Sequence, residues 1–505
     1  MKIALLPPDA VGHTNPLLAL SRELLARGHE LRFFLQTEMH EEHLSTFHDR
    51  ASTCVFGDRN RDNGLGEALK NVPAYEDQDE TDQKIGDWAL YSYQDKLPEN
   101  FPKMLEALKD YAPDVIVYDP VDVLAAMAAH LLQVPSVSHL TLPAFNVHPI
   151  AMGNDKSAAE AMEQTRQSKT ARACNQHFID KYGFDFLANY VPASYHNLNG
   201  LSICTGIKEF DPEMPECVRE IYGDMDKDCV YVGPMLISKE EGRISSLNPG
   251  PKCEHQAIDE PFPHEALEKH KEDGKTIVYA SFGTVATGML WDFPERPKLL
   301  INERSTGKAF CRPLWTRLTE AFGDKDEYVV VLATVCEDPE ALNGIEIPGN
   351  FIVRRRCPQL EVLKVADVFV THGGANSMME SITAGVPMLC LPYFADQFAN
   401  AETITREGLG LHYANPVADC SSADLVESVA KLLEERERFV ANCQRVQKSL
   451  NEAGGAKRAC DCIEAYVTSF QGHQVNPVPK GPVLQRCATN ELVDSFEIVN
   501  HEELA

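Results

Sequence analysis

The pattern of hydrophobic and polar positions repeats the order buried strand, polar turn, amphipathic helix. Short apolar runs at residues 2–6, 114–118 and 276–282 each lead into a polar or glycine-containing loop. Residues 16–27 instead carry leucines at helical spacing, and Gly28 follows them as a helix stop. Continuous apolar runs of this length are typical of strands buried on both faces of a parallel sheet. The pattern therefore predicts an α/β protein built from βαβ units.

The same order is clearest between residues 365 and 402. An apolar run over residues 368–370 ends in Thr371-His372-Gly373-Gly374, which predicts a strand and a tight turn. Asn376 and Ser377 then open a segment with apolar residues at helical spacing. Glycine lets the backbone approach a ligand closely, and the first N–H groups of a helix attract anions. This turn therefore predicts an anion-binding site.

A second strand completes the unit. Gly385 ends the predicted helix, Pro387 prevents its continuation, and residues 388–391 form the next apolar run before a loop with Asp396 and Gln397. Open α/β sheets bind nucleotides at the carboxyl ends of their strands. The stretch therefore predicts a nucleotide site.

Length and charge narrow the class of protein. A chain of 505 residues is too long for one ordinary core and suggests two to four domains. Its 47 basic and 76 acidic side chains give a net charge of −29, which repels nucleic acid and makes it an unlikely class of partner. A nucleotide would then need a local positive site. The run Arg354-Arg355-Arg356 either contributes to such a site or is a solvated loop.

The cysteines and the hydropathy pattern indicate the cellular compartment of the protein. The 15 cysteines are scattered without a C-x-x-C pair, as expected for reduced thiols of a cytoplasmic protein. The first apolar run is interrupted by Pro7 and Pro8, unlike a signal peptide, and no run of 18 apolar residues occurs. We expect a cytoplasmic monomer without a membrane span.

The stretch 365–402 closely resembles the donor-site signature of family-1 UDP-sugar glycosyltransferases. That signature has H-G-G-x-N-S, a nearby Glu, G-V-P and D-Q in order, and the matching residues here are His372–Ser377, Glu380, Gly385–Pro387 and Asp396-Gln397. The resemblance implies the GT-B fold, an α/β architecture of two facing Rossmann-like domains with a cleft between them. It also implies a sugar donor of the UDP-sugar class.

Further motifs extend the resemblance over the chain. Gly12-His13-Thr14-Asn15-Pro16 matches the family's G-H-x-x-P loop, Asp119 follows a buried strand as in the family, and Val232-Gly233-Pro234 matches the V-G-P that ends its first domain. The implied organisation is an acceptor domain over 1–237, a linker over 238–270, a nucleotide-sugar domain over 271–460, and a helix crossing back with a tail over 461–505. The variable acceptor side would include the aromatics of residues 57–100 and helices within 151–200.

The resemblance assigns a role to each matching residue. His13 would be the general base, and Asp119 would hold and stabilise its ring. The donor diphosphate would lie on His372 and the N–H groups near Gly374, Asn376 and Ser377, opposite Ser281, Gly283 and Thr284. Glu380 would bind the ribose, Asp396 and Gln397 the sugar, and Gln359 with Arg356 the base.

Two features depart from the family pattern. Arg356 stands where many relatives have an aromatic that stacks on uracil, which leaves the identity of the base open, although a guanidinium can also stack. Residues 286–312 are an insertion near the expected donor site, of unknown role.

The implied activity is inverting transfer of a sugar from a UDP-sugar to a hydroxyl of a small, largely apolar acceptor, such as a phenol, flavonoid, polyketide or sterol. Glucose is favoured because Gln397 ends the motif as in glucose-using relatives. No cofactor or metal is expected, and Asp224-Met225-Asp226 lies in an acidic loop without a preceding strand, so we interpret it as a solvated turn and not a manganese site. The alternatives are a UDP-sugar epimerase or hydrolase of the same architecture and a non-catalytic sugar-nucleotide-binding subunit.

Overall fold

A computed structural model of the chain describes residue 176 and the ranges 1–57, 97–144, 179–183, 200–211, 229–244, 256–292 and 306–470. Within these ranges it does not describe residues 9, 37, 39–40, 121–122, 239–240, 337 and 395. Several predictions from the sequence lie outside these residues. They concern the aromatics Tyr75, Trp88, Tyr91 and Tyr93, most of 151–200, Asp224–Asp226, the middle of the 286–312 insertion and the tail beyond Gly472.

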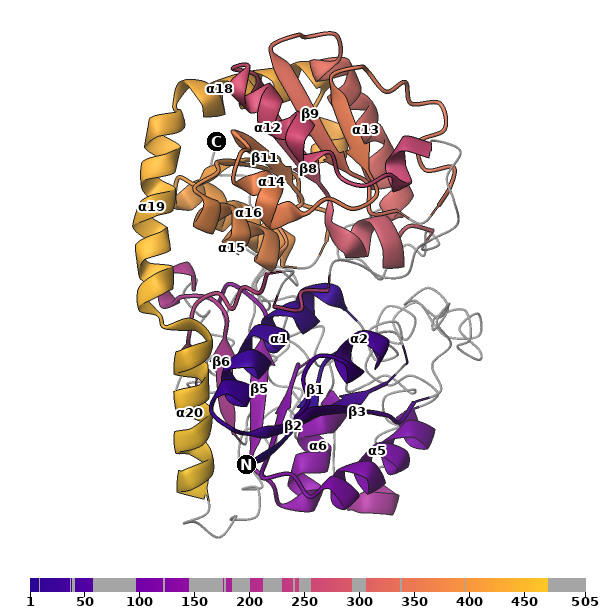
Figure 1. The fold of residues 1–505 in the computed structure, drawn as a ribbon, viewed down its shortest axis with the longest axis vertical. Helices are drawn as coiled ribbons and strands as arrows, with labels where there is room; N and C mark the ends of the chain where they lie inside the picture. The colour runs from indigo at the N-terminus through magenta and orange to yellow at the C-terminus, as the bar shows by residue number, and fades with distance from the viewer. Residues whose placement is uncertain are drawn as a thin grey trace, which may run out of the picture.

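Two parallel sheets lie one above the other (Figure 1). The first has the order β3-β2-β1-β4-β5-β6-β7. Its strands are β1 (Lys2–Leu6), β2 (Glu30–Leu35), β3 (Ala51–Val55), β4 (Val115–Tyr118), β5 (Ser136–Leu140), β6 (Leu201–Cys204) and β7 (Cys229–Tyr231). The second has the order β10-β9-β8-β11-β12-β13. Its strands are β8 (Thr276–Ser281), β9 (Tyr328–Ala333), β10 (Phe351–Arg354), β11 (Val368–Thr371), β12 (Met388–Cys390) and β13 (Gly410–His412).

Helices cover both faces of each sheet, as the continuous apolar strands predict. Beside the first sheet lie α1 (Val11–Ala26), α2 (Glu41–Ser45), α5 (Leu97–Tyr111) and α6 (Val123–Leu132). The second sheet carries α12 (His264–Glu272), α13 (Gly307–Phe322), α14 (Gln359–Leu363), α15 (Ala375–Ala384), α16 (Gln397–Arg406), α17 (Pro416–Asp419), α18 (Ser422–Glu434) and α19 (Arg436–Glu452). The last helix is α20 (Gly455–Phe470).

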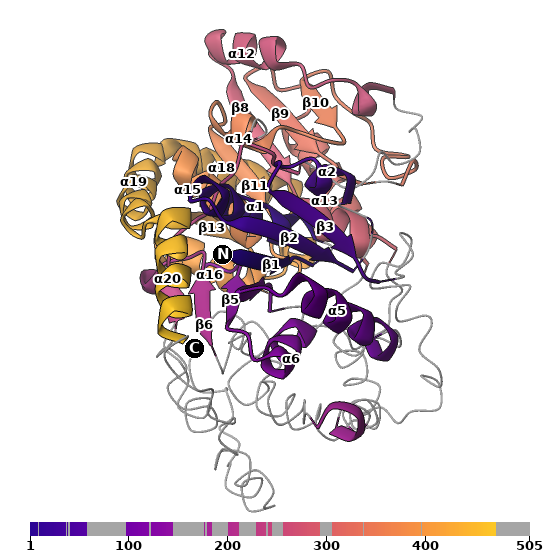
Figure 2. The ribbon, with the colours of Figure 1, turned by 60° about the horizontal axis from the view of Figure 1, so that its bottom comes forward.

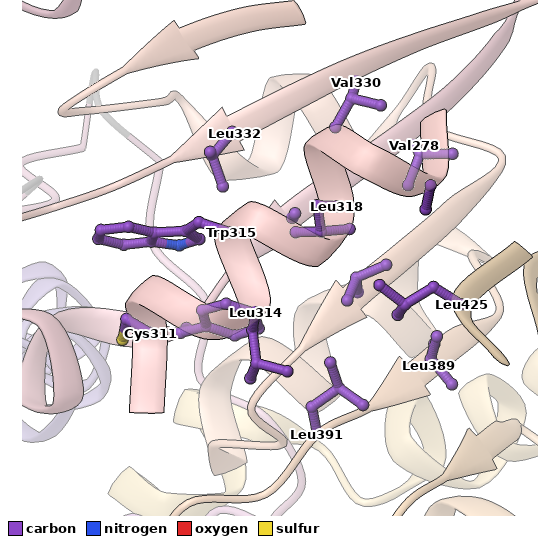
Figure 3. Packing of buried hydrophobic residues seen from close by; sticks show 14 of the residues in the cluster. Val278, Cys311, Leu314, Trp315, Leu318, Val330, Leu332, Leu389, Leu391 and Leu425 are labelled. Carbon is purple, nitrogen blue, oxygen red and sulfur yellow. The ribbon is translucent and has the colours of Figure 1, made fainter. Parts of the chain in front are cut away.

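The strands alternate their side chains between two cores, as period-two geometry requires. In β1, Ile3 and Leu5 pack with α1 and α20, whereas Ala4 and Leu6 pack with α5 and α6. In the second sheet, Val278 packs under α13 together with Trp315 and Leu318 (Figure 3). The predicted α/β class is therefore confirmed for both halves.

The first helix begins earlier than the sequence indicates. The helical spacing of the leucines from residue 16 onward predicts a loop over residues 7–15, yet α1 begins at Val11 and holds Pro16 inside it. Proline lacks an N–H group, so Pro16 leaves the carbonyl of Gly12, four residues earlier, without its helical donor. His13 consequently lies in the first turn of a helix and not in a loop.

The two described ends of the 286–312 insertion belong to the core of the second half. Trp291 is buried and stacks on Trp315 with ring centroids 5.6 Å apart. Its indole N–H donates to Asp338 at 2.8 Å, and Lys308 reaches the same carboxylate. These ends are thus anchored structural elements.

The C-terminal helices connect the two halves. In Figure 1, α19 runs beside the second sheet and α20 continues beside the first. Ala459, Cys460 and Ile463 of α20 enter the core of the first sheet, and Arg27 binds Asp461 and Glu464 on the same helix. The domain boundaries given above remain a prediction.

Candidate active site

His13 and Asp119 meet at the carboxyl edge of the first sheet. Asp119 follows β4 directly and is 2 % exposed, and its Oδ2 lies 2.8 Å from His13 Nδ1. The hydroxyl of Thr141, just beyond β5, lies 2.9 Å from the same nitrogen. Groups that follow the neighbouring strands β4 and β5 therefore hold Nδ1 of the imidazole in place. Because Nδ1 is engaged, Nε2 is the nitrogen that can exchange a proton with a ligand.

The charges around His13 favour its protonated form. Burial lowers the pKa of His13, but the charge of Asp119 and its hydrogen bond raise it, and so does the charge of Asp396. The net pKa of His13 lies above its ordinary value. Asp396 belongs to the second half of the chain, so this interaction places the two predicted groups near each other across the boundary.

His372 has a different environment at the edge of the second sheet. Its ring lies between two glycines: a Cβ added to Gly283 or Gly374 would come within 2.3 or 2.5 Å of His372 Nε2. Burial lowers the pKa of His372 to about 4. His372 is therefore a neutral imidazole at physiological pH and can act toward an anion only as a hydrogen-bond donor.

The turn after β11 presents the start of α15. Gly374 is the N-cap residue and provides no side-chain cap, so the first N–H groups of the helix are not satisfied by a capping side chain. The sequence suggested Asn376 and Ser377 as the helix start, but they lie inside the first turn. Ser281 ends β8 opposite Thr371, and Gly283 and Thr284 follow it, which brings this predicted group beside His372.

Glu380 lies at the centre of a buried polar network. Its side chain is 2 % exposed, and Oε2 accepts a hydrogen bond from Gln359 Nε2 at 2.7 Å. Gln359 also donates to Ser377 and accepts from the hydroxyl of Tyr279. The structure thus brings Gln359, Ser377 and Glu380 together. Glu380 forms an ion pair as well with Arg243, at 2.7 Å, which the sequence did not indicate.

Asp396 and Gln397 lie at the start of α16, facing the same boundary. Asn400, one turn later, donates to Asp396 Oδ2 at 2.7 Å and to the carbonyl of Gly373 at 2.8 Å. Burial raises the pKa of Asp396, and this outweighs the hydrogen bond from Asn400 and the charge of His13, which lower it. Gln397 Oε1 accepts hydrogen bonds from the backbone N–H groups of Tyr393 and Phe394. Its amide nitrogen is therefore the group that could contact a ligand, as a donor.

A direct hydrogen bond joins the two halves beside these groups. Asn376 Nδ2 donates to the carbonyl of Gly12, the acceptor that Pro16 leaves without a helical partner. Both ribbon views place α1 next to α15, in agreement with this contact (Figure 2). Pro16 therefore leaves the Gly12 carbonyl available, and Asn376 donates to it.

Two arginines of the run 354–356 hold a neighbouring segment of the chain. Arg354 pairs with Glu260 at 3.6 Å, and the buried Arg355 pairs with Asp259 at 2.7 Å, so both hold the segment before α12 in place. Arg356 is exposed at the end of β10. A contact between Arg356 and a base remains a prediction.

Sequence reasoning missed several residues of the site. Thr141, Arg243 and Asn400 carry no motif, and only tertiary contacts identify them. His139, on β5 next to the strand that carries Asp119, is 1 % exposed, and neither ring nitrogen has a hydrogen-bond partner in the described structure. Burial lowers the pKa of His139 to about 4, and the charge of His13 acts in the same direction.

The described residues contain neither a metal-binding cluster nor a membrane-spanning helix. No three His, Cys, Asp or Glu side chains in these ranges gather closely enough to hold a metal ion. No helix in the same ranges is long and apolar enough to cross a membrane.

Comparison with curated proteins places this arrangement among known enzymes. NDP-glycosyltransferase YjiC of Bacillus subtilis (strain 168) is 27% identical over 470 residues, covering 92% of this chain and 97% of its own. Oleandomycin glycosyltransferase of Streptomyces antibioticus is 24% identical and covers 95% of this chain and 94% of its own.

Solved structures agree on the architecture. The glycosyltransferase of kitacinnamycin has a TM-score of 0.60 at 22% identity, covering 92% of this chain and 99% of its own. CalG4, the calicheamicin glycosyltransferase, has a TM-score of 0.59 at 22% identity, with coverages of 93% and 98%. These similarities confirm the predicted GT-B fold.

The family model described as UDP-glucoronosyl and UDP-glucosyl transferase matches residues 96–448, which is more than half of the chain. That span includes Asp119 and every donor-motif residue from Ser281 to Gln397. The chain therefore belongs to the UDP-glucoronosyl and UDP-glucosyl transferase family and is a glycosyltransferase with the GT-B fold.

Proposed function

We propose that the protein transfers glucose from UDP-glucose to a hydroxyl of a small, largely apolar natural product, with inversion at the anomeric carbon and without a metal ion. The observation that carries this proposal is the His13–Asp119 pair, held at 2.8 Å and within electrostatic range of Asp396 of the donor motif. Relatives named for oleandomycin, kitacinnamycin and calicheamicin support a natural-product acceptor such as a phenol, flavonoid, polyketide or sterol.

In this mechanism the acceptor hydroxyl gives its proton to His13 Nε2 as its oxygen bonds to the anomeric carbon. The bond from that carbon to the diphosphate breaks, and its electron pair leaves with the diphosphate. Asp119 stabilises the imidazolium that forms, and its hydrogen bond to Nδ1 holds the ring in the tautomer that leaves Nε2 free. Attack opposite the leaving group converts an α-linked donor into a β-glycoside.

The second half of the site would hold the donor. The diphosphate would accept hydrogen bonds from neutral His372 and from the first N–H groups of α15, whose dipole favours negative charge. Glu380 would accept the ribose hydroxyls, and Asp396 with the amide nitrogen of Gln397 would bind the sugar. Backbone dipoles fixed before the reaction suit a developing charge, because they need no reorganisation.

A mass-spectrometric screen tests the activity. Phenols, flavonoids, sterols and macrolides would be incubated with UDP-glucose, UDP-galactose, UDP-N-acetylglucosamine and dTDP-glucose. We expect an acceptor mass increased by one hexose residue with UDP-glucose. Free sugar without any glycoside would instead indicate a UDP-sugar hydrolase, an altered free UDP-sugar an epimerase, and binding without turnover a non-catalytic subunit.

His13→Ala tests the proposed base. We expect transfer to be lost while calorimetry still detects UDP binding, because His13 lies outside the donor subsites. His130→Ala, on α6, is the matched histidine control and should keep the original rate. Unchanged turnover in His13→Ala would refute the assignment.

A further inference from the structure

Both oxygens of the Glu380 carboxylate are already engaged. Oε1 lies 2.7 Å from Arg243 Nη2, and Oε2 accepts from Gln359 Nε2 at 2.7 Å. The side chain of Glu380 is 2 % exposed and that of Arg243 is 19 % exposed. A ribose hydroxyl can reach this carboxylate only if it shares or displaces one of these donors.

The two donors differ in origin. Gln359 begins α14 and is held inside the second half by Tyr279 and Ser377. Arg243 belongs to the segment that follows β7, and its own N–H donates to the carbonyl of Ser238. Arg243 is therefore the donor that a ligand can move without disturbing the second sheet.

That segment is fastened to the first half of the chain. Asn15 of α1 makes two hydrogen bonds with the backbone of Ile244, at 3.0 and 2.9 Å. Arg22 donates to the carbonyl of Glu241, and His43 binds the carbonyl of Gly242 at 2.8 Å. The ion pair between Arg243 and Glu380 thus bridges the two halves beside the bond from Asn376 to Gly12.

The ion pair changes the energetics of ribose recognition. A buried carboxylate without a partner is strongly destabilising, and a buried cation beside it removes most of that cost. A site that offers only a buried polar group to a hydroxyl rejects an analogue lacking the hydroxyl, because the group is then left unpaired. With Arg243 on Oε1, Glu380 stays paired whether or not that hydroxyl is present.

We propose that Arg243 is a specificity-determining residue that lets the donor site accept nucleotides of both ribose and deoxyribose. A ribose hydroxyl takes over Oε1 from the guanidinium, whereas a deoxyribose leaves the ion pair in place. This inference rests on the proposed role of Glu380 in the donor site.

The test is calorimetry of UDP and 2′-deoxy-UDP on the full chain, as wild type and Arg243→Met. We expect the wild type to bind the two nucleotides within about tenfold of each other. In Arg243→Met, UDP should bind as tightly or more tightly, and 2′-deoxy-UDP at least tenfold more weakly, because Oε1 of Glu380 then lacks its donor. Arg445→Met, which removes an exposed arginine paired with Glu407, is the control and should leave the ratio unchanged.

Each other outcome is informative. The quantity to compare is the dissociation constant of 2′-deoxy-UDP divided by that of UDP. If this ratio is equal in wild type and Arg243→Met, the arginine is merely structural. If the ratio is smaller in Arg243→Met, Arg243 itself binds the ribose, and either result overturns the proposal. If Arg243→Met does not fold, Arg243→Gln replaces it with the same expected direction. A wild type that binds neither nucleotide contradicts the proposed function, whereas one that transfers sugar with an unaltered ratio contradicts only the role of Arg243.

Discussion

The two halves of the molecule each place a histidine at the carboxyl edge of a parallel sheet, and the two histidines are in opposite electrostatic states. His13 contacts the buried Asp119, and its pKa lies above the ordinary value. His372 lies between Gly283 and Gly374, and burial lowers its pKa to about 4. The same side chain at the carboxyl edge of each sheet is thus suited to two tasks.

The difference comes from the neighbours and not from the fold. A carboxylate beside an imidazole favours the cation, which is what a group that must take a proton requires. A ring enclosed by backbone without a carboxylate stays neutral, and toward an anion it acts as a hydrogen-bond donor. We infer that each half of the fold has been adapted by the groups around its histidine.

The largest expected effect comes from removing the charge that distinguishes the two histidines. Asp119→Asn should lower kcat by about 10³-fold, because the amide does not stabilise the imidazolium and permits the wrong tautomer. The pH profile should shift to lower pH, since the pKa of His13 loses the contribution of Asp119. Steady-state kinetics across pH checks both.

A control for this variant lies at the other end of β4. Asp114, which precedes β4 and accepts from the backbone N–H of Lys2, is at the opposite end from Asp119. Asp114→Asn should leave the pH profile in place. An unshifted profile in Asp119→Asn would contradict the comparison.

Acid stability should reveal the neutral histidines. The pKa of buried His139 is about 4 in the folded state against an ordinary value of 6.5, so between these pH values the unfolded chain binds a proton that the native protein does not. Stability is therefore full above pH 6.5 and falls as the pH is lowered toward 4, by up to about 3 kcal/mol for this group.

His139→Phe should remove that part of the acid sensitivity, as measured by urea unfolding at pH 7 and pH 4.5. The control His48→Phe, on the turn before β3, should keep the acid sensitivity of the wild type. Equal losses of free energy of unfolding in wild type and His139→Phe would show that His139 is not held neutral.

Crowding the ring of His372 should have a moderate effect on the second half alone. A methyl group at Gly374 would lie 2.5 Å from His372 Nε2, so Gly374→Ala must displace the ring. We expect UDP to bind about tenfold more weakly by calorimetry, equivalent to about 1.4 kcal/mol. Gly349→Ala, where an added Cβ meets nothing within 4 Å, should bind normally. Normal UDP binding by Gly374→Ala would exclude His372 from the anion site.

The smallest effect concerns the contact between the halves. Pro16→Ala restores an N–H group that competes with Asn376 for the carbonyl of Gly12. We expect kcat/KM to fall about threefold, while the melting temperature stays level or rises because proline is unfavourable inside a helix. A fall in both quantities would indicate simple damage to α1, and no change in kcat/KM would show that this hydrogen bond does not position the halves.

Much of this molecule could be predicted from local sequence. The apolar runs at residues 2–6, 114–118, 276–282, 368–370 and 388–391 predicted β1, β4, β8, β11 and β12, because a fully buried strand needs no polar alternation. Gly385 ends α15 with φ of 70°, as a left-handed cap position requires, and β12 follows as expected. The resemblance named Gln359, Ser377 and Glu380 as donor-site residues, and the contacts between α14 and α15 bring the three side chains together.

Tertiary structure alone decided the remainder. It started α1 at Val11, joined Gly12 to Asn376, paired Arg243 with Glu380, and gave His13 and His372 opposite protonation tendencies. The contacts of Gly12 with Asn376, of Arg243 with Glu380 and of His13 with Asp119 each join groups more than a hundred residues apart in sequence, whereas periodicity and capping act over one or two turns. The sequence by itself therefore determined which chemical groups are present and on which elements, and the packing of the two halves decided which of them meet and in what charge state.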